Sequence, residues 1–208
     1  MSERGALLHT LDRLFAGPRE TVLTLEAFLQ GLQGRSYPFA VMALNLPNCV
    51  PTGIPWLSTV TGLPMLFLLC QYFAGKPVPS LPGFLGRKGL PRGKLHDFLD
   101  RIRRPIEHLE STIHPRFEWW VRGLPRRLLQ LAWAFLVLLL ALPIPFDNFL
   151  PAWTILFFCL ALIEDDGVMA MLGWLFTLFT VAWTAFLFFI GHAAVMAAFA
   201  ALRSMLFG

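Results

Sequence analysis

The chain has 208 residues, of which 56% are hydrophobic and 14% charged, with a formal net charge of +4. Soluble domains carry about 25% charged residues, and the mean hydropathy of this chain is +0.62. These values exclude a water-soluble monomer and predict an all-α integral membrane protein with several membrane segments.

Residues 1–35 are expected to form an N-terminal amphipathic segment. Apolar side chains recur there at helical spacing; they are Val22, Leu25, Phe28, Leu29 and Leu32. A helix of this kind is predicted to lie along lipid headgroups.

Residues 36–75 form a stretch of 40 residues without a charge. One helical crossing of a bilayer needs only about 20 residues, so the chain is expected to turn back within this stretch. The turn is predicted at residues 46–55, where proline removes the amide donors that a helix needs; the prolines are Pro47, Pro51 and Pro55. The resulting hairpin either spans the bilayer or is re-entrant, in which case protein or a wet cavity must surround its tip.

Residues 76–127 form a basic linker with twelve of the seventeen Lys and Arg residues, so the positive-inside rule places it in the cytoplasm. Residues 95–113 have the apolar spacing of a second amphipathic helix on the headgroups. Four linker arginines either attract anionic lipid or recognise a phosphorylated lipid or sugar phosphate; they are Arg101, Arg103, Arg104 and Arg116. A nucleic-acid partner is not expected.

Residues 128–166 predict a second proline-broken hairpin, whose prolines are Pro143, Pro145 and Pro151. Adding 96 to Leu46, Pro47 and Pro55 gives Leu142, Pro143 and Pro151. We interpret this match as an internal duplication, although two leucine-rich segments also share leucines by chance. Duplicated broken helices are typical of secondary transporters; the alternative is a duplicated scaffold without a transport path.

Two further features complete the chain. The acidic residues 164–166 predict a solvated turn whose carboxylates pair with linker arginines. Residues 167–208 are expected to form C-terminal transmembrane helices, with a break at Gly191-His192 between a long helix and a shorter one.

The candidate site residues lie in the two hairpins. Asp147 is a carboxylate within an apolar hairpin, which is costly unless it is paired, hydrated or faces a cavity; the alternative is that Asp147 or Asn148 caps the following helix. The proposed solute-binding or transport residues are Asn48, Thr52, Gly53, Asp147 and Asn148, with Asn45 as a further polar contributor. We find no glycine-rich phosphate loop, metal-ligand spacing or nucleophile motif, so neither an enzyme nor a cofactor or metal is expected.

The proline motifs support a family resemblance. They are Leu46-Pro47 with Pro51, Gly53 and Pro55, then Gly62-Leu63-Pro64, Gln71, Pro115-Arg116, residues 142–151 and Asp166-Gly167. From about residue 10 to 190 the chain resembles the ExoD family of bacterial membrane proteins. The resemblance implies an inner-membrane location and a role in exopolysaccharide synthesis or export. This chain has Asp165 where the family commonly has an arginine.

Two functional hypotheses follow. In the first, the protein is transporter-like and moves a small anionic or lipid-phosphate solute between the two hairpins. In the alternative, it is a non-transporting accessory component that assembles with polysaccharide synthesis enzymes. Short membrane segments leave polar backbone groups at the hairpin tips, and another protein surface must cover these groups. A homodimer is therefore expected in either case.

Overall fold

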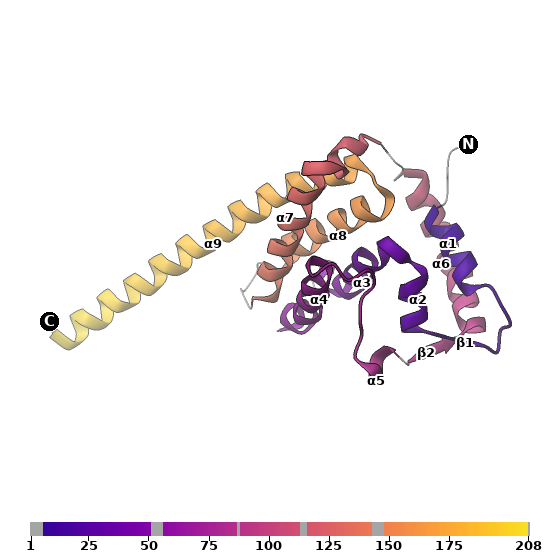
Figure 1. Ribbon diagram of the computed structural model, residues 1–208. Coiled ribbons are helices and arrows are strands. Elements are labelled where there is room, and N and C mark those ends of the chain that lie inside the picture. Colours follow the sequence, from indigo (N-terminus) through magenta and orange to yellow (C-terminus); the bar gives the residue numbers. More distant parts are fainter. Residues whose placement is uncertain (1–5, 51–55, 87, 113–115, 143–147, 208) are drawn as a thin grey trace.

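The computed structural model describes residues 6–50, 56–86, 88–112, 116–142 and 148–207 (Figure 1). It is predominantly helical, which confirms the expected all-helical class, and the strands β1 and β2 form one short antiparallel pair. The elements are α1 (Ala6–Phe15), β1 (Val22–Thr24), α2 (Leu25–Gly31), η1 (Gln33–Arg35), α3 (Ser36–Asn45), η2 (Leu46–Cys49), α4 (Leu57–Phe73), α5 (Gly83–Gly86), β2 (Gly89–Pro91), α6 (Arg92–Thr112), η3 (Glu118–Val121), α7 (Gly123–Ala141), α8 (Phe149–Glu164) and α9 (Gly167–Phe207).

Helices α3, α4, α7 and α8 form the central bundle. Helix α3 contacts α4 and α8, and α7 also contacts α4 and α8. Each segment predicted as a hairpin therefore contributes two contacting helices, and each hairpin contacts the other. Fully buried side chains such as Trp133 of α7 and Phe158 of α8 fill the core. Helices α4 and α7 approach closely at Gly62, where an added Cβ atom would lie 2.8 Å from Ala141 Cα.

Among the residues that the structure describes, two helices are long and apolar enough to cross a membrane. They are α7 and the part of α9 from Gly167 to His192, with mean hydropathies of 1.5 and 1.9. Helices α4 and α8 are apolar but shorter, with 17 and 16 residues. A helix of 16 residues measures about 24 Å at ~1.5 Å per residue, somewhat less than the ~30 Å hydrocarbon core.

The N-terminal segment and the basic linker pack together beside the bundle (Figure 1). Helix α1 contacts α6, and β1 pairs with β2 in the register Val22↔Pro91, Leu23↔Leu90 and Thr24↔Gly89. Val22 therefore lies in a strand and not in the predicted helix. We call α1, β1, α2, α5, β2 and α6 the N-terminal module.

The apolar residues of this module face protein. Leu11 and Phe15 of α1 form a buried cluster with Leu99 of α6 and Ile163 of α8. The prediction that the amphipathic segments rest on lipid headgroups is therefore wrong for Leu29, Leu32 and Leu99, which are at most 3% exposed. An amphipathic pattern identifies an apolar face, but tertiary contacts decide what covers it.

Two arginine side chains of α6 bind α1 through hydrogen bonds and an ion pair. Arg92 Nη1 donates a hydrogen bond to Leu14 O at 2.6 Å and another to Ala16 O, and both carbonyls lie at the end of α1. Arg103 Nη2 lies 2.8 Å from Asp12 Oδ1. The two Arg92 bonds occupy carbonyl groups that the end of a helix leaves without a partner.

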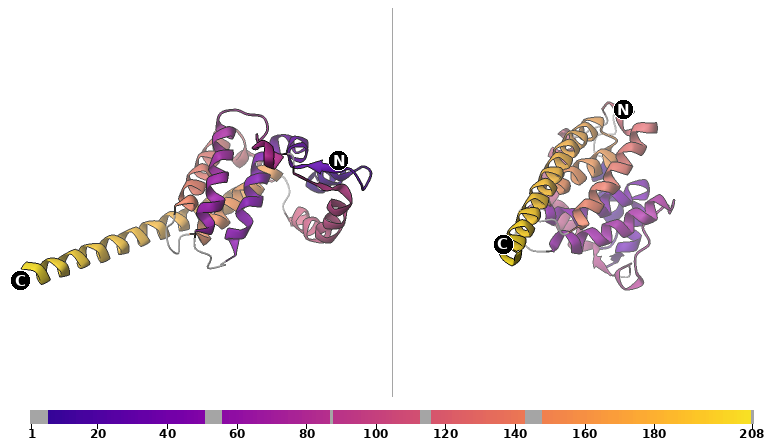
Figure 2. Two further views of the ribbon diagram at one scale, coloured as in Figure 1. Left: turned by 90° about the horizontal axis from the view of Figure 1, so that it is seen from below. Right: turned by 90° about the vertical axis from the view of Figure 1, so that its left-hand side faces the viewer.

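Helix α9 is continuous for 41 residues, so the predicted break at Gly191-His192 is wrong. A single glycine costs a helix only about 1 kcal/mol, and no proline follows Pro151 in the sequence. The first part of α9 packs on α8. Its remainder projects away from the bundle, on the side opposite the N-terminal module (Figure 2).

Candidate functional site

The ends of α3 and η2 meet the start of α8 in a buried polar contact. Asn45, the last residue of α3, is fully buried, and its Nδ2 donates a hydrogen bond to Ala152 O at 2.7 Å. Cys49 Sγ lies 3.8 Å from the same carbonyl oxygen. Trp153 Nε1 donates to Cys49 O at 3.1 Å. We call Asn45, Cys49, Ala152 and Trp153 the hairpin junction, because it joins the two predicted hairpins.

The local sequence explains why polar groups collect here. Pro47 lies in the first turn of η2, where α3 gives way to a 3-10 helix. Proline has no amide hydrogen, and the ends of helices leave carbonyl groups that need other donors. At Cys49 the donor is the Trp153 indole, which is more than 100 residues away in the sequence.

Asn45 has one atom whose hydrogen-bonding capacity is unused. Its Oδ1 is buried and accepts no hydrogen bond from the residues that the structure describes. The bond from Nδ2 to Ala152 O fixes which way the amide points, because a flipped amide would set two oxygens against each other. A buried acceptor without a donor costs about 1–3 kcal/mol. A water molecule or a ligand hydroxyl at Oδ1 would remove that cost.

Asn48 connects η2 to α4. It is 6% exposed, and its Nδ2 donates to Thr61 Oγ1 at 2.8 Å. Thr61 Oγ1 in turn donates to Leu57 O at 3.0 Å. A second hydroxyl pair lies between α8 and α9, where the Oγ1 atoms of Thr154 and Thr180 are 3.1 Å apart.

The structure places only some of the predicted hairpin residues. Pro47 is exposed, and Pro151 is buried in the first turn of α8. Asn148 precedes α8, but its side chain makes no capping hydrogen bond; its carbonyl accepts from Ala152 N at 3.2 Å. Seven predicted residues lie outside the described ranges: Pro51, Thr52, Gly53, Pro55, Pro143, Pro145 and Asp147.

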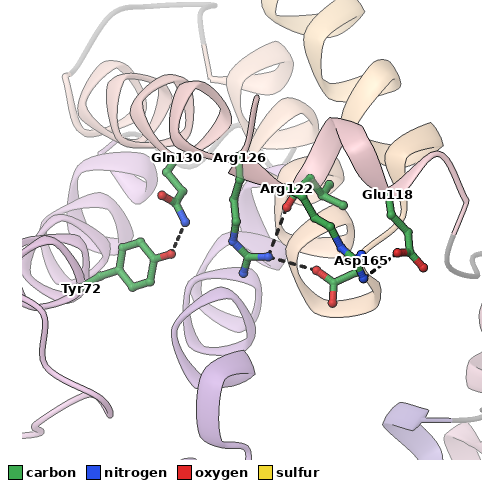
Figure 3. A network of polar contacts seen from close by, with 7 residues as sticks. Tyr72, Glu118, Arg122, Arg126, Gln130 and Asp165 are labelled. Carbon is green, nitrogen blue, oxygen red and sulfur yellow. Dashed lines mark hydrogen bonds and ion pairs between the residues drawn. The ribbon is translucent and has the colours of Figure 1, made fainter. Parts of the chain in front are cut away.

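A polar network lies at the other end of α7 (Figure 3). Arg126 Nη1 lies 3.1 Å from Asp165 Oδ1 and donates to Val121 O at 3.3 Å. One turn further along α7, Gln130 Nε2 donates to Tyr72 OH at the end of α4. These contacts join α7 to α4 and to the turn between α8 and α9.

Beside this network, Arg116 and Asp166 form a second ion pair. The distance from Arg116 Nη2 to Asp166 Oδ2 is 3.4 Å, and the Asp166 side chain is completely buried. Asp166 Oδ1 also accepts from Val168 N at 2.8 Å, which caps α9. Gly167 N donates to Arg116 O at 2.7 Å, and a side chain at Gly167 would overlap Phe117 O.

The expected pairing of the acidic turn with arginines from the linker is thus confirmed for Asp165 and Asp166. The expectation that this turn is solvated is wrong for Glu164 and Asp166, which are 7% and 0% exposed because they pack inside the protein. The four arginines predicted to contact phosphate or lipid divide into two groups. Arg103 and Arg116 form internal ion pairs, whereas Arg101 and Arg104 are exposed on α6.

The chemistry of the hairpin junction is that of neutral hydrogen bonding. Its polar groups are an amide, a thiol, an indole and backbone carbonyls. Across the residues that the structure describes, no group of three His, Cys, Asp or Glu side chains is placed to hold a metal ion. Sequence reasoning named Asn45 and Asn48 but missed Trp153, Gln130 and Tyr72. An isolated Gln within a long apolar run was the available signal for Gln130.

Comparisons with known proteins identify the family of this chain. A family model described as exopolysaccharide synthesis, ExoD, matches residues 7–186. The protein ExoD of Rhizobium meliloti is 27% identical over 196 residues, covering 92% of this chain and 80% of that protein. An uncharacterized protein of Synechocystis is 26% identical over 167 residues, covering 80% of this chain and 79% of that protein. No solved structure matches the chain. Because the family model covers most of the sequence, this chain belongs to the ExoD family of exopolysaccharide synthesis proteins.

Proposed function

We propose that this protein is a multi-pass protein of the bacterial inner membrane and moves a small solute for exopolysaccharide synthesis through the hairpin junction. The observation that carries the proposal is Asn45 Oδ1, a buried acceptor without a described donor at the point where the two hairpins meet. Substrate sites of many secondary transporters lie where broken helices of two repeats meet.

The contacts of the bundle support a duplicated architecture. The first hairpin consists of α3 and α4, and the second of α7 and α8. The first helix of each hairpin contacts the second helix of the other: α3 contacts α8, and α7 contacts α4. An arrangement of two equivalent hairpins about an approximate two-fold axis has this pattern of contacts. Pro47 and Pro143 are the corresponding breaks in the proposed repeat.

The charge distribution supports an orientation. Arg126 lies in the first turn of α7, and Arg116 pairs with Asp166 at the start of α9. The N-terminal module packs on Ile163, near the end of α8. With the basic linker in the cytoplasm, α9 begins on the cytoplasmic side and runs toward the periplasm. The hairpin tips then lie toward the periplasmic side.

The groups of the junction favour a solute that donates hydrogen bonds, such as one with sugar hydroxyls, over the anionic solute considered from the sequence. The unused group at Asn45 is an oxygen, which attracts donors and repels anions. Exposed Arg101 and Arg104 would attract anionic lipid or precursors to the cytoplasmic surface.

The test is cysteine accessibility in a variant in which Cys49, Cys70 and Cys159 are replaced by alanine. Asn48→Cys and Asn148→Cys are treated in intact cells with a small charged thiol reagent and with a bulky impermeant one. Transport through a wet path predicts labelling of both by the small reagent and protection from the bulky one. Equal labelling by both reagents would mean spanning hairpins with surface turns, and would refute the transport path.

A variant of Asn45 complements this test. Asn45→Leu removes the acceptor and keeps a similar volume, so we expect exopolysaccharide output to fall at least tenfold at unchanged protein level. Leu44→Met is the matched control one residue earlier in α3 and is expected to retain output. Full output from Asn45→Leu would exclude the junction as the solute site.

An accessory role is the second candidate, and one observation favours it. Phe117, Trp119 and Leu124 are about 60% exposed or more, and they lie around η3 at the arginine-rich end of the bundle. Exposed aromatic side chains of this kind are enriched at protein interfaces. Co-purification of a polysaccharide synthase that is lost in Trp119→Ser would favour assembly over transport.

A further inference from the structure

Gly62 and Gly173 lie inside helices at places where two helices come close together. An added Cβ atom at Gly62 would lie 2.8 Å from Ala141 Cα, and one at Gly173 would overlap the Phe158 ring. Glycine in a helix costs about 0.5–1 kcal/mol relative to alanine. At these two positions close packing offsets that cost, because no larger residue fits.

Gly191 differs from these two glycines. It lies inside α9 and is exposed, and an added Cβ atom would have no described heavy atom within 4 Å. The contacts described within one copy of the chain therefore give no packing reason for a glycine at this position.

Gly191 continues a helix face that is otherwise used for packing. It follows Gly173 by 18 residues, which is about five helical turns. We call the residues of this face the α9 seam: Gly173, Thr177, Thr180, Thr184 and Gly191. In its first half Gly173 meets Phe158 and Thr180 meets Thr154, both on α8. Beyond Thr184 exposure rises, and neighbouring Phe188 is 76% exposed.

The length of α9 adds a second argument. Residues 167–202 contain no charged side chain and form one continuous helix. These 36 residues extend about 54 Å, whereas a hydrocarbon core of ~30 Å accommodates about 39 Å of helix even at a tilt of 40°. At the average tilt of about 20° the hydrocarbon core accommodates only about 32 Å of helix. Gly191, about 36 Å along α9 from Gly167, then lies just beyond the hydrocarbon, where lipid tails cannot cover it.

We infer that the far half of the α9 seam binds the same seam of a second copy of this chain. A two-fold dimer joins identical surfaces, so each seam would meet its own counterpart, with closest approach near Gly191. Small residues let two membrane helices approach closely. The first half of the seam already packs a helix in this way within one copy.

A groove beside the seam has room for side chains of the partner copy. It has a volume of about 310 Å³ and lies between α7 and α9. Its walls include Phe135 and Leu139 of α7 with Thr184 and Phe188 of α9. The opposite face of α9, with exposed Leu175, Phe179 and Phe186, is the face expected to contact lipid.

The first test is oxidative crosslinking in native membranes, with Cys49, Cys70 and Cys159 replaced by alanine. Thr184→Cys and Phe188→Cys lie on or beside the seam, and Ala182→Cys is the matched control on the opposite face. The dimer predicts a crosslinked species of twice the monomer mass for the seam variants and not for the control. Monomer alone, equal crosslinking of the control, or crosslinking only to a different protein would overturn the inference.

The second test measures the dimer itself. Gly191→Ile adds bulk to the seam, whereas Ala182→Ile adds a branched side chain nine residues earlier, half a turn away around the helix axis. By light scattering in mild detergent, Gly191→Ile is expected to weaken the dimer at least tenfold and Ala182→Ile to leave it unchanged. A Gly191→Ile protein that is folded and as dimeric as the unmodified chain would refute the seam contact. This outcome is independent of the transport proposal, which the accessibility of Asn48 and Asn148 tests.

Discussion

Replacing Asp166 tests whether the buried ion pair holds the turn between α8 and α9. Asp166→Asn removes the charge that faces Arg116 and keeps an oxygen that can cap α9, since Asn caps helices about as well as Asp. Removing one partner of a fully buried pair costs about 3–5 kcal/mol. The Arg116 side chain is 35% exposed, so we expect a smaller loss of about 2 kcal/mol. Asp166→Ala also loses the bond from Val168 N and should cost about 1 kcal/mol more.

The assay is tryptophan fluorescence during unfolding in mixed micelles with increasing fractions of a denaturing detergent. Asp165→Asn is the control, because its partner Arg126 is 35% exposed and Asp165 itself 45% exposed. An exposed pair contributes about 0–1 kcal/mol, and asparagine tolerates the left-handed backbone at position 165, where φ is +50°. Equal losses for Asp166→Asn and Asp165→Asn would refute the reasoning that burial makes the first pair matter more.

Two further substitutions test close contacts. Gly167→Ala places a Cβ atom against Phe117 O and should lower the free energy of unfolding by about 1–3 kcal/mol. Gly34→Ala is the control: an added Cβ atom there has nothing within 4 Å, so the free energy of unfolding should change by less than about 0.5 kcal/mol. Equal values for the two variants would contradict the close approach at Gly167. Trp153→Phe removes the donor to Cys49 O and should cost about 1–3 kcal/mol in the same unfolding assay. An unchanged Trp153→Phe protein would show that water replaces the indole.

Local sequence patterns determined the elements of this fold. Apolar stretches longer than one crossing, each with prolines near the middle, predicted helix pairs at residues 36–75 and 128–166, and the structure has α3 with α4 and α7 with α8 there. Helical apolar spacing likewise predicted α6. These features depend on neighbours within a few turns of the same segment, so a single sequence contains the information.

The tertiary structure decided which segments meet. The sequence did not indicate that β1 pairs with β2, that the Asn45 amide reaches Ala152 O across 107 residues, or that α9 continues through Gly191. Apolar periodicity shows that a face will be covered but not by what, so Leu99 was assigned to lipid although it packs against α1 and α8. The pairing of Arg116 with Asp166 was partly predictable, because acidic residues that follow an apolar segment have few other charges to pair with than the linker arginines that precede it. The contacts of the hairpin junction depend on the packing of α3 against α8, and only the folded chain specifies that packing.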